Sequence, residues 1–171
     1  MEHRPATPAD LADIMAIVAD AQRFLKASGV DQWQNGYPER CDFEEDIRQG
    51  ACEAFFLDGA LAGLLTVLPG PEPDYTHIYE GVWRTASPYC VFHRSAVSEK
   101  YRGRGVASEM FSYAENVARE LRYGSIRVDT HRDNRAMRGL LEKRGYEYCG
   151  VIYIDGSPEA GTPRAAYEKI L

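Results

Sequence analysis

The sequence predicts a mixed α/β fold in which helices flank a sheet. Strand-like and helix-like runs alternate through the second half of the chain, which favours crossover connections between strands. A pair of strands at the C-terminus adds antiparallel pairing. A length of 171 residues fits one domain, and no internal repeat divides the chain, so residues 1–171 are expected to form a single domain.

The N-terminal part is expected to hold one strand and one helix. Residues 2–6 can form a short opening strand. Thr7-Pro8-Ala9-Asp10 has the pattern of a helix start, with an N-cap, a proline in the first turn and a variant capping box. Apolar residues at helical spacing continue to Leu25, and Ser28-Gly29 ends the helix.

A second, short helix and a β-hairpin follow. The helix is expected to start at Asp42 and to end at Gly50. The predicted strands of the hairpin are Cys52–Leu57 and Ala60–Val67, and Asp58-Gly59 between them is the signal of a type I′ turn.

The second half of the chain alternates further strands with helices. Residues 69–74 form a loop rich in proline, and residues 75–87 have no clear periodicity. Strands are expected at Tyr89–Val97, Ser125–Thr130, Tyr148–Ile154 and Ala165–Ile170, and helices at Val106–Leu121 and Asn134–Arg144.

Composition places the chain among globular proteins. Apolar residues make up 44% and charged residues 27%, which excludes disordered and collagen-like chains. No apolar run approaches the roughly 18 residues of a membrane span, and the N-terminus lacks the apolar core of a secretion signal. The four cysteines are scattered without metal-ligand spacing, so reduced thiols in the cytoplasm are expected, with neither a structural metal nor a membrane partner.

Charge is unevenly distributed along the chain. The formal net charge of −6 disfavours nucleic acid as the main partner. Residues 94–144 nevertheless carry 12 basic and 7 acidic residues, a net charge of +5, which leaves −11 for the remainder. This division suggests that one part of the protein meets an anion and another a cation, although solvated helix faces would give the same imbalance.

The segment Val97–Ala107 has the pattern of an anion-binding turn. A predicted strand ends, Gly103 and Gly105 bracket a tight turn, and a helix begins. The first amides of a helix lack intrahelical acceptors, and the helix dipole favours an anion beside them. No Lys-Ser/Thr pair follows, which excludes a P-loop, and Ser108 stands where a dinucleotide fingerprint needs its last glycine. A purely structural turn is the alternative.

Motifs on both sides of this turn make the chain similar to a known family. Arg102-x-x-Gly105-x-Ala107 after a strand resembles the acyl-CoA pyrophosphate loop (Q/R-x-x-G-x-G/A) of the GCN5-related N-acetyltransferase superfamily. Leu140–Tyr146 resembles the L-Y-x-K-x-G-F ending of that family, and the resemblance covers nearly the whole chain. It implies the acyl-CoA N-acyltransferase fold, a mixed and mostly antiparallel sheet splayed between its fourth and fifth strands, with acetyl-CoA (coenzyme A) in the splay.

The resemblance also assigns the residues that would hold acetyl-CoA. Main-chain groups of Ala96 and Val97 would pair with the pantetheine arm, and Asn134 would lie near the thioester. A main-chain amide near Val97 is expected to polarise the thioester carbonyl. The pyrophosphate would lie against the turn formed by Arg102, Gly103, Arg104, Gly105, Val106, Ala107 and Ser108.

His93 is the candidate general base. An amine acceptor is almost wholly protonated at neutral pH, so a base helps to expose the nucleophile. Alternation along Tyr89–Val97 would place Val91, His93, Ser95 and Val97 on one face. His93 lies four residues before Val97, and some members of the superfamily are similar in carrying a catalytic histidine there. The alternative is a partly buried histidine that bonds to a backbone carbonyl.

The usual general acid of the superfamily is absent. The tyrosine of the L-Y-x-K-x-G-F ending corresponds to Leu141, which has no proton to donate. Tyr146, Tyr148 and Tyr153 are substitutes by position only, and none of them is assigned as the acid. A thiol with a pKa of about 8.5 is a fair leaving group without one.

Acceptor contacts are expected outside the glycine turn. Trp33 and Tyr37 lie between the first two predicted helices, where the superfamily builds part of its acceptor pocket, and Glu80 is a reserve contact for an amine. His131 belongs to a polar cluster at a strand end that offers too few ligands for a metal site. Asp133 in the same cluster is expected to cap the next helix.

The leading hypothesis is an acetyl-CoA-dependent N-acetyltransferase that acts by direct attack in a ternary complex, with a primary amine of a small molecule, an amino acid or a peptide as acceptor. A non-catalytic acyl-CoA-binding or regulatory module of the same fold is the main alternative, and Leu141 supports it. A partner-binding protein that uses its acidic surface is a third. A homodimer is compatible with the resemblance.

Overall fold

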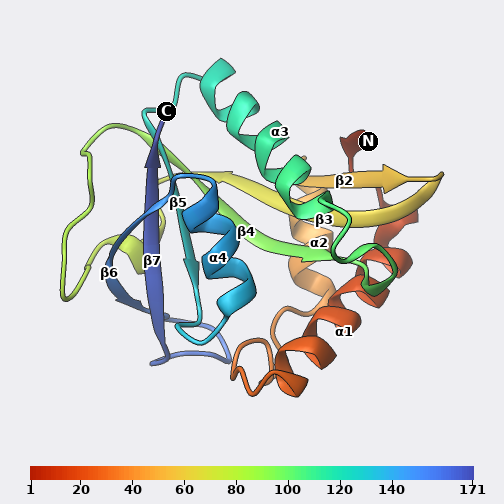
Figure 1. The fold of residues 1–171 in the computed structure, drawn as a ribbon, viewed down its shortest axis with the longest axis horizontal. Coiled ribbons are helices and arrows are strands. Elements are labelled where there is room, and N and C mark those ends of the chain that lie inside the picture. The colour runs from red at the N-terminus through yellow and green to blue at the C-terminus, as the bar shows by residue number, and fades with distance from the viewer.

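The computed structural model describes all residues, 1–171, and contains one seven-stranded sheet with the strand order β1-β2-β3-β4-β5-β7-β6 (Figure 1). The strands are Glu2–Pro5 (β1), Cys52–Leu57 (β2), Ala60–Pro69 (β3), Tyr89–Val97 (β4), Ser125–Thr130 (β5), Glu147–Tyr153 (β6) and Pro163–Ile170 (β7). All neighbouring strands are antiparallel except β4 and β5, which run parallel. The predicted mixed, mostly antiparallel sheet is confirmed.

Four α-helices accompany the sheet, as the periodicity of the sequence predicts. They are Leu11–Ala27 (α1), Arg40–Arg48 (α2), Val106–Glu120 (α3) and Arg135–Lys143 (α4), with short 3-10 turns at Pro8–Asp10, Pro73–Tyr75 and Glu99–Tyr101. The hairpin turn has positive φ at both central residues, 55° at Asp58 and 75° at Gly59, as a type I′ turn requires. None of the helices combines the length and the hydropathy needed to cross a membrane.

Two helix caps differ from the sequence prediction. α2 begins before Asp42, because Glu39 is its N-cap and the Asp42 carboxylate accepts the Glu39 amide at 2.6 Å in a capping box. α4 is capped by Asn134 rather than by Asp133, and Oδ1 of Asn134 accepts the amide of Met137 at 3.1 Å. Asparagine and aspartate cap helices about equally well, so their order in the sequence does not decide between them.

β4 and β5 diverge in the middle of the sheet (Figure 1). Their pairing is limited to Tyr89–Val91 against Ser125–Arg127, so the second half of β4 has no partner on this side. A bulge accompanies the divergence: Arg94 has a φ of 45°, and the pairing of β4 with β3 skips from His93 to Ala96. Because a bulge bends its strand and increases the local twist, it turns the end of β4 away from β5.

The bulge also changes which face of the sheet each β4 residue meets. Phe92 packs in the core cluster that contains α3, whereas Ala96 packs in the cluster that contains α1. One irregularity in register moves every later side chain to the opposite face. The prediction that the odd-numbered residues of β4 share one face is therefore wrong beyond His93.

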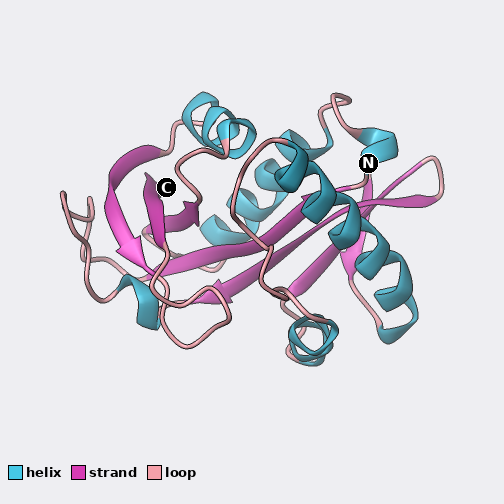
Figure 2. Ribbon diagram, turned by 90° about the horizontal axis from the view of Figure 1, so that it is seen from below, coloured by secondary structure: helices cyan, strands magenta, loops and turns pink.

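The two largest apolar clusters lie on opposite faces of the sheet. The larger contains 17 buried residues, mostly from α3, α4 and the strands, and the second contains 13, mostly from α1, α2 and the strands. α4 and α2 accordingly lie on opposite faces (Figure 2). The packed helices hold the two halves of the sheet in place on either side of the divergence.

Candidate active site

The divergence of β4 and β5 opens into a cleft of about 830 Å³. Its walls include the second half of β4, the end of β5, the first turn of α3 and one side of α4. Residues of the α1–α2 segment and of the β6–β7 loop line it as well. Sites for cofactors and small molecules typically measure about 300–1,000 Å³, so the cleft is large enough for one.

The turn before α3 presents unpartnered main-chain amides to this cleft. Gly103 and Gly105 have φ values of 75° and 83°, a region that glycine enters without steric cost. No protein group accepts a hydrogen bond from the amides of Gly103, Gly105, Val106, Ala107 or Ser108. All five residues line the cleft. Because the helix dipole adds partial positive charge at the same place, the turn can bind an anion.

The two arginine side chains of the turn are held by neighbouring groups. Arg102 lines the cleft, donates to the Asp20 carbonyl at 2.9 Å and stacks on Phe24, 4.4 Å from the ring centroid. Arg104 does not line the cleft, and its guanidinium lies 5.3 Å from the ring centroid of Tyr101. The structure therefore brings Arg102 to the cleft and leaves Arg104 outside it.

The unpaired edge of β4 forms another wall. Ala96 and Val97 line the cleft, and β4 pairs there only with β3, so main-chain groups that face β5 have no strand partner. Asn134 also lines the cleft, but its amide is engaged at both ends. Its oxygen caps α4, and its Nδ2 donates to Oε1 of Gln32 at 3.2 Å.

His93 forms a pair with Glu72 inside the cleft. Nε2 of His93 lies 3.1 Å from Oε2 of Glu72, and the two side chains are 20% and 21% exposed. Burial alone would raise the pKa of Glu72, but the hydrogen bond and charge of His93, helped by the Asp74 amide and the charge of Arg94, lower it. Glu72 is therefore ionised at neutral pH. The partner of His93 is a carboxylate and not a backbone carbonyl.

Arg94, the bulge residue, connects the cleft to α2. Its Nε and Nη2 donate to Asp46 at 2.7 and 2.6 Å, and its Nη1 donates to the Tyr37 hydroxyl oxygen at 2.9 Å. Burial raises the pKa of Tyr37, although Arg94 opposes this. The Tyr37 hydroxyl therefore keeps its proton at neutral pH, and Tyr37 lines the cleft.

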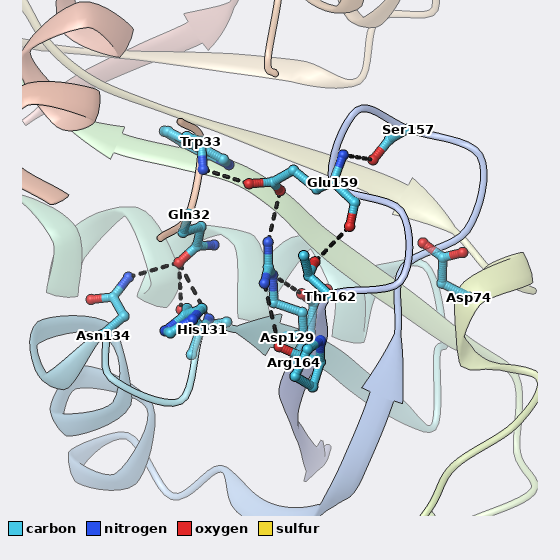
Figure 3. A network of polar contacts seen from close by, with 12 residues as sticks. Gln32, Trp33, Asp74, Asp129, His131, Asn134, Ser157, Glu159, Thr162 and Arg164 are labelled. Atoms are coloured by element: carbon cyan, nitrogen blue, oxygen red, sulfur yellow. Dashed lines mark hydrogen bonds and ion pairs between the residues drawn. The ribbon is translucent and has the colours of Figure 1, made fainter. Parts of the chain in front are cut away.

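Gln32 ties the α1–α2 segment to the end of β5 (Figure 3). Its Oε1 accepts the Thr130 hydroxyl and the His131 amide, both at 3.3 Å, as well as the side chain of Asn134. A partly buried oxygen with three donors holds the segment across the divergence of the sheet.

Glu159 makes a second connection over the same gap (Figure 3). Its Oε1 accepts the Trp33 amide at 2.5 Å, and its Oε2 lies 2.8 Å from Nη2 of Arg164. Arg164 is 1% exposed, and its Nε is 4.0 Å from Asp129. Trp33, which has a φ of 63°, is thereby fixed as part of the cleft wall.

Some residues singled out from the sequence lie elsewhere. Glu80 is exposed and does not line the cleft. Tyr148 and Tyr153 are 52% and 45% exposed on β6 and do not line it either. No three His, Cys, Asp or Glu side chains gather in an arrangement that would hold a metal ion.

Leu141, which stands where the family motif has a tyrosine, does not line the cleft. Leu141 is 0% exposed within the core cluster of α3, and its neighbour Leu140 lines the cleft instead. Tyr146 is buried in the same cluster, where burial raises its pKa far above its ordinary value. Neither side chain is placed to deliver a proton into the cleft.

Sequence reasoning missed Glu72, Glu159 and Arg164. The two glutamates lie in segments rich in turn residues, and Arg164 lies at the start of a strand. One signal was available: Glu72 stands between Pro71 and Pro73, which restrict the backbone on both sides. For Glu159 and Arg164 no local signal exists, because their partners come from distant parts of the chain.

A profile of the acetyltransferase (GNAT) family matches residues 18–146. The chain belongs to this family. It is 36% identical to a GNAT family acetyltransferase from Streptococcus agalactiae 2603, whose crystal structure superposes with a TM-score of 0.86 over 99% of this chain and 95% of that one. A GNAT family acetyltransferase from Listeria monocytogenes 4b F2365 is 25% identical, with a TM-score of 0.75 over 99% and 94% of the two chains.

A curated relative is also named as an N-acetyltransferase. The uncharacterized N-acetyltransferase YesJ of Bacillus subtilis (strain 168) is 26% identical over 150 residues, which are 86% of this chain and 82% of that protein. The predicted family and fold are thus confirmed, and the chain is an acetyltransferase of the GNAT type.

Proposed function

We propose that this GNAT protein is an acetyl-CoA-dependent N-acetyltransferase. It transfers the acetyl group to a primary amine of a small molecule, an amino acid or a peptide, by direct attack in a ternary complex. The observation that carries the proposal is the row of unpartnered amides at Gly103 and residues 105–108, which lines the same cleft as His93. Convergent donors at a helix N-terminus suit a diphosphate.

The residues present fit acetyl-CoA along the cleft. The diphosphate lies against the turn amides, and Arg102 adds positive charge beside them. The free edge of β4 at Ala96 and Val97 offers main-chain partners to the amides of the pantetheine arm, and Asn134 lies near its thioester end. Bound acetyl-CoA supplies the acetyl group as a thioester.

The protein supplies a base and an oxyanion contact. His93 accepts the proton of the acceptor amine, which makes the nitrogen nucleophilic. An amide near Val97 polarises the carbonyl oxygen where negative charge develops. Leu141 leaves the thiolate without a tyrosine donor, and a leaving thiol with a pKa of about 8.5 tolerates this.

The acceptor occupies the part of the cleft formed by Trp33, Tyr37 and the His93–Glu72 pair. Aromatic side chains beside carboxylates favour a cationic amine over an anion. Residues 1–171 act as one catalytic domain, either alone or as a homodimer. The four cysteines are unpaired, which suits the reducing cytoplasm.

Thermal unfolding with and without acetyl-CoA tests the cofactor site. At a ligand concentration of 100 times Kd, binding adds about 2.7 kcal/mol to the free energy of unfolding, or about 5–10 °C in Tm for a chain of this size. Acetate and AMP should produce no such shift. No shift with millimolar acetyl-CoA would overturn the proposal.

A pair of glycine variants locates the binding site. Gly105 and Gly50 have φ values of 83° and 68°, and at either position an added methyl group meets no atom within 4 Å. Gly105→Ala and Gly50→Ala therefore carry similar backbone strain. Gly105→Ala places its methyl group where the diphosphate lies, and we expect it to raise the Kd for acetyl-CoA at least about tenfold, a loss of about 1.4 kcal/mol. Gly50→Ala, at the end of α2, should leave Kd unchanged.

Turnover separates the enzyme from a binding module. Thiol release from acetyl-CoA is measured against a panel of primary amines, with the acetylated product identified by mass spectrometry. Binding without release of thiol for any amine would favour the non-catalytic acyl-CoA-binding module instead.

A further inference from the structure

We propose that Glu72 is a positioning residue that holds neutral His93 as the Nε2–H tautomer, so that Nδ1 is the nitrogen that takes the proton of the acceptor amine. The catalytic role of the pair rests on the proposed function. The tautomer itself does not, and it is measured without any substrate.

Residues 70–75 form an arm between β3 and β4 that carries the carboxylate of Glu72. This arm is anchored at several points. The amide of Glu72 donates to the Tyr89 hydroxyl oxygen at 3.0 Å, and the amide of Gly70 donates to the Tyr89 carbonyl at 2.9 Å. A Cβ at Gly70 would lie 2.7 Å from the Tyr89 ring, so the arm packs directly on that ring. The guanidinium of Arg127 also stacks on Tyr89, 3.9 Å from the ring centroid. The arm therefore delivers the carboxylate to one place beside β4.

The hydrogen-bond roles of the pair follow from its charge. An ionised carboxylate only accepts hydrogen bonds, so the nitrogen that faces Glu72 must carry the hydrogen. That nitrogen is Nε2 of His93, at 3.1 Å. Nδ1 of His93 forms no hydrogen bond with the protein, and the ring lines the cleft. The free lone pair of the neutral ring is therefore on Nδ1.

The groups around the pair favour the same arrangement. Arg94 on β4 helps to keep Glu72 ionised. Asp74 and Tyr75 follow Glu72 on the arm, and the Tyr75 ring centroid lies 6.4 Å from that of His93. The Tyr75 hydroxyl donates to Asp129 on β5 at 2.7 Å, so it is not available to His93. Glu72 is the only side chain that forms a hydrogen bond with the imidazole.

The proton balance of the transfer follows directly. The amine nitrogen forms the new C–N bond while the C–S bond of the thioester breaks and its electron pair stays on sulfur. The protonated amine first gives one proton to Nδ1, which makes its nitrogen nucleophilic, and the imidazolium keeps its Nε2–H on the ionised carboxylate and returns the proton to water. The second proton leaves the nitrogen as the C–N bond forms and passes through water to the thiolate.

Nitrogen-15 NMR of the histidine side chains tests the tautomer in the protein without ligand. The chain has four histidines, and a His93→Gln spectrum identifies the signals of His93. We expect the neutral ring to be in the Nε2–H form. Glu72→Gln keeps the size of the side chain but offers an amide N–H as well as an oxygen, so we expect the share of the Nδ1–H form to rise. A wild-type Nδ1–H form, or an unchanged ratio of the two tautomers in Glu72→Gln, would refute the proposal.

Kinetics test the role of the pair in the reaction. Glu72→Gln should lower kcat about 10- to 100-fold with little change in KM. Glu72→Asp keeps a carboxylate that only accepts hydrogen bonds, so it should retain the Nε2–H form and more of the wild-type kcat than Glu72→Gln does. Glu120→Gln, at the exposed end of α3, is the matched control and should behave as wild type.

The two proposals fail in different ways. If wild type binds acetyl-CoA and acetylates no amine, the proposed function fails, and the NMR result still decides the tautomer. If wild type turns over and Glu72→Gln keeps both the wild-type kcat and the wild-type tautomer, the positioning role fails alone. The rise in Tm with acetyl-CoA shows whether each variant is folded.

Discussion

The buried pair of Asp46 and Arg94 is a sharp test of how the fold supports the cleft. The Asp46 side chain is 4% exposed and that of Arg94 is 13%. Asp46 accepts two hydrogen bonds from the guanidinium and a third from the Thr66 hydroxyl at 2.7 Å. Asp46→Asn keeps the volume of the side chain and removes its charge, which leaves Arg94 buried without a counter-charge.

The expected loss follows from this burial. Breaking a buried ion pair by removing one partner costs about 3–5 kcal/mol, because the other charge stays desolvated. For a chain of this size 1 kcal/mol corresponds to about 2–4 °C, so Tm should fall by about 6–20 °C. Asp46→Leu combined with Arg94→Met removes both charges and should recover most of the loss.

Urea unfolding followed by circular dichroism measures the free energies of the single and double variants. Arg94 also donates to Tyr37, so folded Asp46→Asn should show a raised KM for the acceptor and an unchanged Kd for acetyl-CoA. The reasoning is refuted if Asp46→Asn loses less than about 1 kcal/mol, the range of an exposed ion pair. It is also refuted if the double variant loses as much free energy of unfolding as Asp46→Leu and Arg94→Met lose together as single variants.

Two further predictions concern the N-terminus and α4. Arg4 donates twice to Asp10 and, with Thr7, holds the pKa of that carboxylate well below its ordinary value against the opposing effect of burial. A carboxylate whose pKa is lower in the folded than in the unfolded protein stabilises the fold above the unfolded pKa of about 3.9, and this stabilisation is lost as the pH falls. In Asp10→Asn the free energy of unfolding, measured by urea titration, should therefore decline less between about pH 5 and 2. Leu141→Tyr restores the residue of the family motif but overpacks a fully buried site, so it should cost about 1–3 kcal/mol in unfolding free energy without raising kcat. A faster enzyme of unchanged stability would show that the tyrosine reaches the cleft.

The elements of the fold were largely predictable because their signals are local. A type I′ turn at Asp58-Gly59 and the glycine stops after helices depend on residues next to one another. The turn at Gly103 and Gly105 belongs to the same class, since its free amides arise from the geometry of any helix start. Where two neighbouring residues cap a helix equally well, as Asp133 and Asn134 do, the local pattern predicts the helix but not which of them is the N-cap.

The divergence of β4 from β5 marks the limit of such reasoning. A period of two residues predicts one face for alternate side chains, and the bulge at Arg94 breaks that period. The strain of a positive φ at a non-glycine residue is sustained by partners on other elements, above all Asp46 on α2. The residues between His93 and Val97 do not contain this information.

The sequence alone predicted the helices and strands, the anion-binding turn, the likeness to the acetyltransferases and the role of His93. Only the tertiary structure shows which residues are partners in the cleft. Glu72 lies 21 positions from His93, Asp46 lies 48 from Arg94, and Glu159 lies 126 from Trp33. Hydrogen bonds and ion pairs act over a few ångströms, so which carboxylate meets which cation depends on how the sheet and its loops bring distant segments together.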